Sequence, residues 1–320
     1  VRILIPWAGI DPTPGANNWS TLDYIVNAAN QRGMAILGVL NSTPAWAIPA
    51  GSALYTTPPS SDTAFASFAA TVAVRYAGEI SAYEVWNEPN SYAFWSPTPD
   101  AAAYTRLLQA TYPAIKAADP KATVIAAGLI SIVNYGNIGI NPVDYLTQMY
   151  AAGAQGYFDA VAFHPYQYTL PFSQGTGYGD VTPIGQLEDM HAVMVANGDG
   201  NKLIWSTEFG DPTSEVSDAT QASIIQDYLT SWSTFSYTGP TFIYTITDIN
   251  TGDGNDADNF GVIQSDGTWK PAANVIQQWT ATHPQQVATP QVMAALLAAN
   301  SASNNTASCE LANPAQNTCS

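Results

Sequence analysis

The sequence predicts an α/β fold in which strands and helices alternate along the chain. Short apolar runs recur at seven places, and amphipathic stretches with helical spacing separate them. Residues that begin or end helices lie between the two kinds of segment. Alternation at this spacing requires a parallel sheet with helical crossovers, which means either a doubly wound sheet or an eightfold (β/α)8 (TIM) barrel.

The elements follow one another in a regular order. Strands are expected at 1–7, 34–40, 81–87, 122–128, 158–164, 202–208 and 240–247. Helices are expected near 20–32, 62–78, 100–118, 142–153, 184–197, 218–234 and 271–280. Gly33 follows a helical pattern, as a C-terminal glycine does. Asp62 and Asp100 stand where N-caps are expected, and Pro120 ends a helix before the next strand.

The strand count favours the barrel. Seven βα units can be identified where a complete barrel has eight, so we expect a (β/α)8 TIM barrel over residues 1–280 that lacks its first βα unit. Residues 281–320 are rich in Ala, Ser and Asn and are expected to form an irregular, low-complexity tail. Cys309 and Cys319 both lie in this tail, either as a short-loop disulfide or as two free thiols.

Composition excludes several classes of partner. Eight Lys and Arg against 25 Asp and Glu give a net charge of −17, which opposes binding to nucleic acid or to an anionic membrane. No apolar run is long enough to span a bilayer, and we expect no signal peptide within this sequence, since Val1 to Trp7 already has the pattern of a strand. Charged residues make up only 10% of the chain, and the paired cysteines would need an oxidising compartment, so we expect a secreted protein. The sequence does not determine the oligomeric state.

Two glutamates follow apolar strands at equivalent positions. Glu88 lies in Trp86-Asn87-Glu88-Pro89-Asn90, where the proline must stop the strand, and Glu208 ends an apolar run before Gly210. The carboxyl ends of parallel strands meet at one face of a barrel, so both side chains are expected in one pocket. Glycosidic cleavage needs one protonated and one ionised carboxyl group, and neighbouring carboxylates separate each other's pKa values in this way.

These motifs resemble the retaining TIM-barrel glycosidases of glycoside hydrolase clan A. The remaining landmarks are most similar to family 39 and its relatives. They are Val1-Arg2 to Trp7, Thr43-Pro44-Ala45-Trp46, Phe158 to Tyr166, Phe260-Gly261-Val262 and Lys270-Pro271-Ala272. The resemblance covers roughly residues 1–280. It implies that Glu88 is the general acid/base on the fourth strand of the family barrel and that Glu208 is the nucleophile on the seventh.

The resemblance also implies a set of substrate-binding residues. Asn87, beside the acid, is expected to bond a sugar hydroxyl next to the reacting carbon, and His164 and Tyr166 are expected to line the sugar site. Arg2 would lie near the nucleophile and favour its ionised form, or would be solvated. Tyr244, near the end of the last strand, would reach the nucleophile or the sugar, or pack in the core.

Flat aromatic rings at strand ends can stack on sugar faces. Trp7, Trp46 and Trp95 are expected in loops on the same rim of the barrel, where such stacking would occur. The alternative for each ring is packing in the core.

No metal or cofactor is expected. His164, His191 and His283 are far apart in the sequence, which gives no zinc motif. Asp248, Asp253, Asp256 and Asp258 crowd one loop, but the loop lacks the EF-hand pattern, so a solvated rim loop is favoured over calcium binding.

The sequence thus predicts a retaining O-glycoside hydrolase that acts on a poly- or oligosaccharide. A catalytically silent carbohydrate-binding protein on a degenerate barrel is an alternative from another class. A transglycosylase would use the same two glutamates and exclude water from the intermediate.

Overall fold

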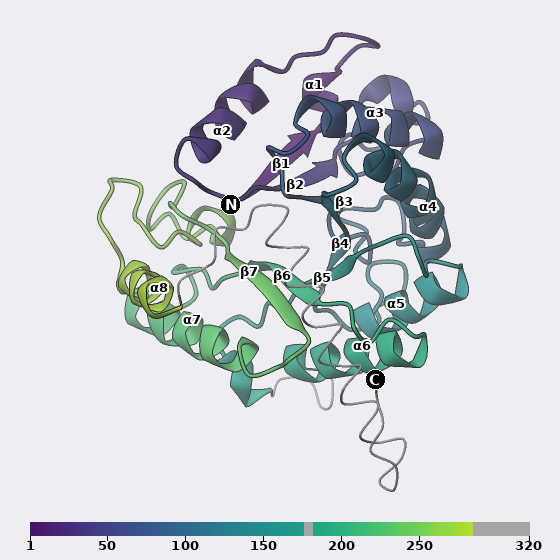
Figure 1. Cartoon of the computed structure of the whole chain (residues 1–320). Helices are drawn as coiled ribbons and strands as arrows, with labels where there is room; N and C mark the ends of the chain where they lie inside the picture. Colours follow the sequence, from purple (N-terminus) through teal and green to yellow (C-terminus); the bar gives the residue numbers. More distant parts are fainter. Residues whose placement is uncertain (176–181, 284–320) are drawn as a thin grey trace, which may run out of the picture.

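The computed structural model describes residues 1–175 and 182–283 and contains one parallel sheet. Its seven strands are hydrogen-bonded in chain order. They are β1 (Arg2–Pro6), β2 (Leu37–Asn41), β3 (Ala82–Val85), β4 (Thr123–Ile130), β5 (Ala160–His164), β6 (Ile204–Phe209) and β7 (Thr238–Ile243). The sheet curves around a central axis (Figure 1).

Helices cover the outer, convex face of this sheet (Figure 1). They are α1 (Trp7–Ile10), α2 (Ser20–Asn30), α3 (Asp62–Arg75), α4 (Ala101–Ala118), α5 (Pro142–Ala151), α6 (Pro183–Ala196), α7 (Asp218–Trp232) and α8 (Pro271–Thr282). Short 3-10 helices lie in the connections, at η1 (Ala45–Ala47), η2 (Phe172–Gln174) and η3 (Asp256–Asp258).

The expected fold class is confirmed as a partial (β/α)8 barrel. All seven strands and the seven longer helices form where the sequence predicts them, and α1 is an addition. Among the described residues, β1 pairs only with β2 and β7 only with β6, so the sheet is open between β1 and β7. Residues 284–320, with Cys309 and Cys319, lie outside the described part of the chain.

Strand side chains alternate between two apolar layers because successive residues point to opposite faces. Residues on the outer face of the strands pack with the helices, as Tyr83, Val85 and Phe163 do. Residues on the inner face form a separate cluster that contains no helical residue. They are Leu37, Ala82, Ile125, Ala160, Ala162, Leu203 and Trp205. Glu84 and His164 also lie on the inner face, so the strands point these polar groups toward the barrel axis.

Helix starts show one error in the expected capping. Asp100 caps α4 as predicted, since its side chain accepts a hydrogen bond from the Ala103 N–H. Asp62 does not cap α3. The preceding Ser61 has the extended backbone of an N-cap and accepts from the Ala64 N–H, while Asp62 is the first helical residue, where its charge still favours the helix dipole.

Within residues 1–175 and 182–283, none of the helices combines the length and the apolar character needed to cross a lipid bilayer.

Candidate active site

Glu88 leaves the end of β3 on a constrained backbone. Trp86 and Glu88 both have positive φ values, 76° and 43°, which are unusual for residues with side chains. The Glu88 N–H bonds to the Gly128 carbonyl of β4, and Pro89 prevents further strand pairing. Asn90 is fully buried, and its side chain bonds the Ile130 backbone N–H and carbonyl. The strand end is therefore fixed on both sides of Glu88.

Glu208 lies near the end of β6, which is paired directly with β7. The next-but-one residue, Gly210, allows the chain to pass very close to β7. A Cβ atom at position 210 would lie 2.0 Å from the Tyr244 carbonyl oxygen. Glycine is required at this contact because no side chain fits there.

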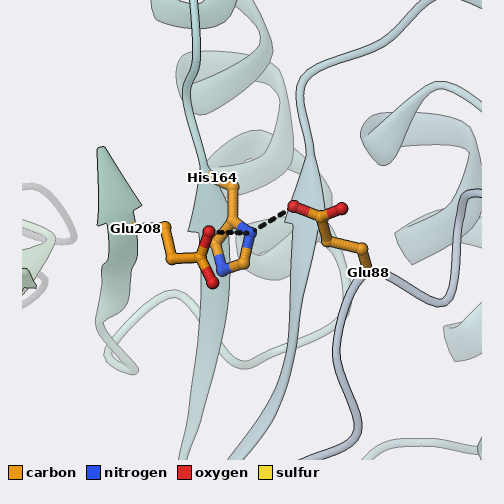
Figure 2. A group of neighbouring side chains, drawn as sticks. All are labelled: Glu88, His164 and Glu208. Carbon is orange, nitrogen blue, oxygen red and sulfur yellow. Dashed lines mark hydrogen bonds and ion pairs between the residues drawn. The ribbon is translucent and has the colours of Figure 1, made fainter. Parts of the chain in front are cut away.

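The two glutamates face each other across His164. Figure 2 shows the imidazole between the two carboxyl groups, with His164 at the end of β5. His164 Nδ1 lies 2.7 Å from Glu88 Oε1 and 3.8 Å from Glu208 Oε2. One oxygen of each carboxyl group and a ring nitrogen of His164 all lie within 4.8 Å of one another. Two strand ends far apart in the sequence thus form one site.

Glu208 is held by two further side chains. The Arg2 guanidinium bonds Glu208 Oε1 through Nη1, and the Tyr166 hydroxyl donates to Glu208 Oε2 at 2.9 Å. Arg2 Nη2 also donates to Asn87 Oδ1 at 2.6 Å. The structure therefore places Arg2, Tyr166 and Asn87 in the same site, with Arg2 against the carboxylate of Glu208 and largely shielded from solvent.

These contacts separate the pKa values of the two glutamates. Burial raises the pKa of Glu88, although its hydrogen bond to His164 opposes the shift. Burial would also raise the pKa of Glu208, but the positive charges of His164 and Arg2 and the Tyr166 hydrogen bond bring it below its ordinary value. Burial alone would lower the pKa of His164, and the carboxylates of Glu208 and Glu88 raise it instead. The two carboxyl groups of one site thus have pKa values shifted in opposite directions.

Two residues of this network escaped the sequence analysis. Glu84, in the middle of β3, is fully buried and accepts from Arg2 Nε at 3.0 Å and from the Gly128 N–H at 2.8 Å. Thr207 Oγ1 lies 2.8 Å from His164 Nε2 and donates to Glu84 Oε1 at 3.2 Å. The sequence signal that could have found Glu84 is its position as a charged residue inside a strand whose other residues are apolar or aromatic.

The aromatic residues divide into exposed and buried groups. Trp46, in η1, is 40% exposed, and Tyr244, after β7, is 37% exposed. The expected loop position of Trp7 is wrong, because the chain turns directly from β1 into α1 and the ring is only 2% exposed, stacked on Phe68. Trp95 is also buried, against the ring of Trp86. Of these tryptophans, only Trp46 presents its ring to solvent.

A cavity of about 640 Å³ adjoins the site between the ends of β4 and β5. Tyr166 forms part of its wall, and the hydroxyl of the same residue donates to Glu208. The side-chain amide of Gln167 also lies at this wall, and both of its polar atoms are buried without a hydrogen-bond partner. The remaining lining residues are Ile130, Ser131, Ile132, Val133, Tyr168, Thr169, Leu170, Thr182, Pro183 and Gln186.

The geometry gives little support to a metal. Glu88, His164 and Glu208 bring donor atoms close enough to hold a cation, but Arg2 places a positive charge on the same carboxylate. In the acidic loop after β7, two of the carboxylates are paired with neighbouring side chains. Asp248 pairs with Lys270, and Asp253 accepts from the Asn259 side chain. In the described part of the chain, the acidic groups of this loop do not converge on one point.

The sequence profile of one family matches most of the chain. The match covers residues 1–239 and describes the family as cellulase, glycosyl hydrolase family 5. The chain belongs to glycosyl hydrolase family 5. No curated protein matches it. The expected resemblance to clan A is confirmed, because family 5 is a member of that clan.

Solved structures of clan A enzymes share the fold of this family 5 chain. A family 39 glycoside hydrolase from Bacteroides cellulosilyticus superposes with a TM-score of 0.69 at 23% identity, over 86% of this chain and 56% of the other. Xylanase 10B from Thermotoga petrophila, solved with xylobiose, gives 0.60 at 17% identity, over 89% and 86%. A family 5 enzyme from Bifidobacterium longum gives 0.65 at 14% identity, over 89% and 70%. The chain thus spans little more than half of the family 39 structure.

Proposed function

We propose that the chain is a retaining O-glycoside hydrolase that cleaves a poly- or oligosaccharide, with Glu88 as the acid/base and Glu208 as the nucleophile. The observation that carries the proposal is the close approach of two strand-end carboxyl groups whose pKa values are shifted in opposite directions. Their nearest oxygens lie within 4.8 Å of each other. So close an approach of two oxygens favours the retaining arrangement, in which whole carboxyl groups lie ~5–5.5 Å apart, over the inverting one, in which roughly 6.5–9.5 Å admits a water.

The reaction would proceed in two steps. A carboxylate oxygen of Glu208 attacks the anomeric carbon while the bond from that carbon to the leaving oxygen breaks, and Glu88 gives its proton to the leaving oxygen. Glu88, now a carboxylate, then takes a proton from water, and the hydroxide oxygen displaces Glu208 from the same carbon. The raised pKa of Glu88 and the lowered pKa of Glu208 supply the starting protonation states.

Neighbouring groups would support both steps. Arg2 and Tyr166 hold Glu208 by two hydrogen bonds, one to each carboxylate oxygen, which orients the attacking group. Asn87 is 7% exposed and next to Glu88, so its amide can reach a hydroxyl of the bound sugar. Such a bond accelerates the reaction only to the extent that it strengthens in the transition state.

A saccharide substrate suits the surroundings of the pair. The 640 Å³ cavity beside Tyr166 falls within the range of ligand sites, and it combines an aromatic and aliphatic wall with an unpaired amide. Because Tyr166 both lines this cavity and bonds Glu208, the cavity would accommodate part of an oligosaccharide that extends beyond the scissile bond. Family membership supports the same substrate class.

The nucleophile assignment can be tested by replacing Glu208 with Gln. We expect turnover of chromogenic glycosides and polysaccharides to fall by at least about 10⁴-fold, because the amide cannot attack the anomeric carbon. The assay is a substrate screen with the variant as the blank. Binding of saccharide by a folded wild-type protein that releases no reducing ends would instead indicate a carbohydrate-binding protein.

The acid assignment can be tested by replacing Glu88 with Ala. Substrates with poor leaving groups should lose far more rate than aryl glycosides with good leaving groups, since the latter need little protonation. The measurement is kcat/KM across a series of leaving groups. Equal losses on both kinds of substrate would contradict the acid role. Transfer of the glycosyl group to sugar acceptors in place of water would identify a transglycosylase.

We also propose that the protein acts outside the cell. The support is compositional, because only 10% of the residues are charged and most of the polar side chains are uncharged.

A further inference from the structure

Glu84 is a buried carboxylate that the reaction described above does not use. Its side chain has no solvent exposure and lies in the middle of β3. A charge in such a place is strongly unfavourable unless it is paired and hydrogen-bonded. Its hydrogen-bond donors are Arg2, the Thr207 hydroxyl and the Gly128 N–H. The contacts that stabilise this buried charge therefore also hold the groups around Glu88 and Glu208 in place.

One oxygen of Glu84 acts on the nucleophile through Arg2. Arg2 Nε donates to Glu84 Oε2 at 3.0 Å, while Nη1 bonds Glu208 and Nη2 bonds Asn87. A guanidinium is planar and its donors are fixed relative to one another. Glu84 therefore determines the orientation in which Arg2 meets Glu208, and the positive charge of Arg2 is divided between the two carboxylates.

The other oxygen acts on the acid through Thr207 and His164. The Thr207 hydroxyl has a single proton, and it donates that proton to Glu84 Oε1 at 3.2 Å. Thr207 Oγ1, 2.8 Å from His164 Nε2, can then only accept, so Nε2 carries a hydrogen. The ring is thereby held with its Nδ1 facing Glu88 Oε1 at 2.7 Å.

We propose that Glu84 is a positioning residue that fixes the hydrogen of His164 on Nε2 and the orientation of Arg2. Through His164 it acts on Glu88, and through Arg2 it acts on Glu208. This inference rests on the proposed function. The charged or titratable groups that face Glu84 are Arg2 from β1 and His164 from β5, whose Nε2 lies 3.9 Å from Oε1. The Gly128 N–H of β4 and the Thr207 hydroxyl of β6 are its neutral donors.

The first test isolates the threonine link without requiring activity. Thr207→Val keeps the shape of the side chain but leaves the buried His164 Nε2–H without an acceptor, whereas Thr207→Ser keeps the hydroxyl. We expect the pKa of His164, followed by NMR titration of its imidazole, to fall in the valine variant and to stay near the wild-type value in the serine variant. The chain has three histidines, so a His164→Asn variant assigns the resonance.

The second test removes the charge. Glu84→Gln retains an acceptor oxygen but no negative charge, so the positive charge of Arg2 acts on Glu208 alone. We expect the acidic limb of the pH profile of kcat/KM to move to lower pH by about one unit, the lower end of the effect of a neighbouring charge. We also expect kcat to fall about tenfold or more with little change in KM, since the Glu84 side chain has no exposed surface for a substrate to touch.

Asp159→Asn is the matched control for this variant. Asp159 also pairs with a cation and accepts from a backbone N–H, but it precedes β5 and so lies at the opposite end of the strand from His164. This variant should leave both limbs of the pH profile and the His164 titration unchanged.

The results separate the two proposals. An inactive wild-type protein would contradict the proposed function, yet the His164 titrations would still decide the inference. If Thr207→Val leaves the His164 titration unchanged, or if Glu84→Gln lowers kcat with both pH limbs in place, Glu84 is only a structural residue. Should Thr207→Val fail to fold by circular dichroism, Thr207→Ala replaces it.

Discussion

Gly128 determines where the imidazole of His164 can lie. A Cβ atom at this position would be 2.1 Å from His164 Nε2 and within 2.7 Å of two ring carbons. The backbone of β4 thus forms a wall against the ring, and the Gly128 N–H bonds Glu84 on the same side. The absence of one methyl group permits the hydrogen bonds that His164 makes to Glu88 and Thr207.

Replacing Gly128 with Ala should therefore strongly reduce the proposed glycosidase activity. The ring must shift by more than a few tenths of an ångström, and misplacement on this scale can cost about 100-fold in rate. Overpacking of the buried site should also lower the free energy of unfolding by about 1–3 kcal/mol. The measurements are kcat on an aryl glycoside and thermal unfolding.

Gly38→Ala is the corresponding control in β2. Its new Cβ would be 2.5 Å from Ile5 Cδ1, the end of a flexible side chain away from the carboxyl groups, so kcat should be retained. Equal loss of kcat in the two variants would show that overpacking of the sheet, and not His164, is responsible.

Individual residues of the site differ in how well the sequence alone predicts them, and the reason is physical. Glu88 and Glu208 could be recognised because a charged residue at the end of an apolar strand has few structural explanations. Glu84 could not, because its partners Arg2 and Thr207 are brought to it only by the folded sheet. Trp7 was placed on the rim because nothing in the sequence shows that a helix follows β1 without a loop.

At the scale of elements, the strands and helices were predictable and the connections between them were not. Hydrophobic periodicity locates each strand to within a few residues, since both faces of the sheet are buried. The loops after β5 and β6 instead depend on tertiary contacts. The Asp211 side chain, after β6, accepts from the Thr169 N–H after β5 at 3.2 Å and so ties the two loops together.

Asp211 makes this tie dependent on pH. Burial raises its pKa to about 6, and its second oxygen is buried without a partner. The folded protein therefore binds this proton more tightly than the unfolded chain does. The stability that the protonated group contributes is complete below the unfolded value of about 3.9 and is lost as the pH rises through about 6.

Asp211→Asn should remove this dependence. Relative to wild type, the variant should gain thermal stability between about pH 4 and about pH 7.5, because wild type alone pays for an ionised carboxylate at the higher pH. The measurement is the difference in Tm at the two pH values. A difference that stays constant, or that shrinks toward higher pH, would contradict this account of the loop contact.

At the scale of the whole molecule, the loops at the active-site end carry exposed aromatic rings. Trp46 follows β2, Tyr92 follows β3, and Tyr168 follows β5, and each ring is at least 40% exposed. Exposed aromatic rings around a site of two carboxyl groups provide platforms for sugar rings. We expect them to matter only for a substrate long enough to reach beyond the scissile bond.

Trp46→Ala tests this expectation. Loss of one stacking contact, worth about 1 kcal/mol, should lower kcat/KM on a polysaccharide about fivefold and leave an aryl glycoside unaffected. Tyr24, 75% exposed on α2, provides the control, because Tyr24→Ala should change neither activity. Parallel losses on both substrates in Trp46→Ala would show that its packing on Trp7, and not sugar stacking, is what matters.

The shared electrostatics of Glu88 and Glu208 also give the proposed reaction its timing. The negative charge of Glu208 is one of the causes that raise the pKa of Glu88. Once Glu208 is esterified to the sugar, that charge is gone, while His164 and Arg2 remain beside the acid. Glu88 then releases its proton more readily, just when the second half of the cycle requires a base. The covalent intermediate itself thus converts the donor into an acceptor, without any movement of the backbone.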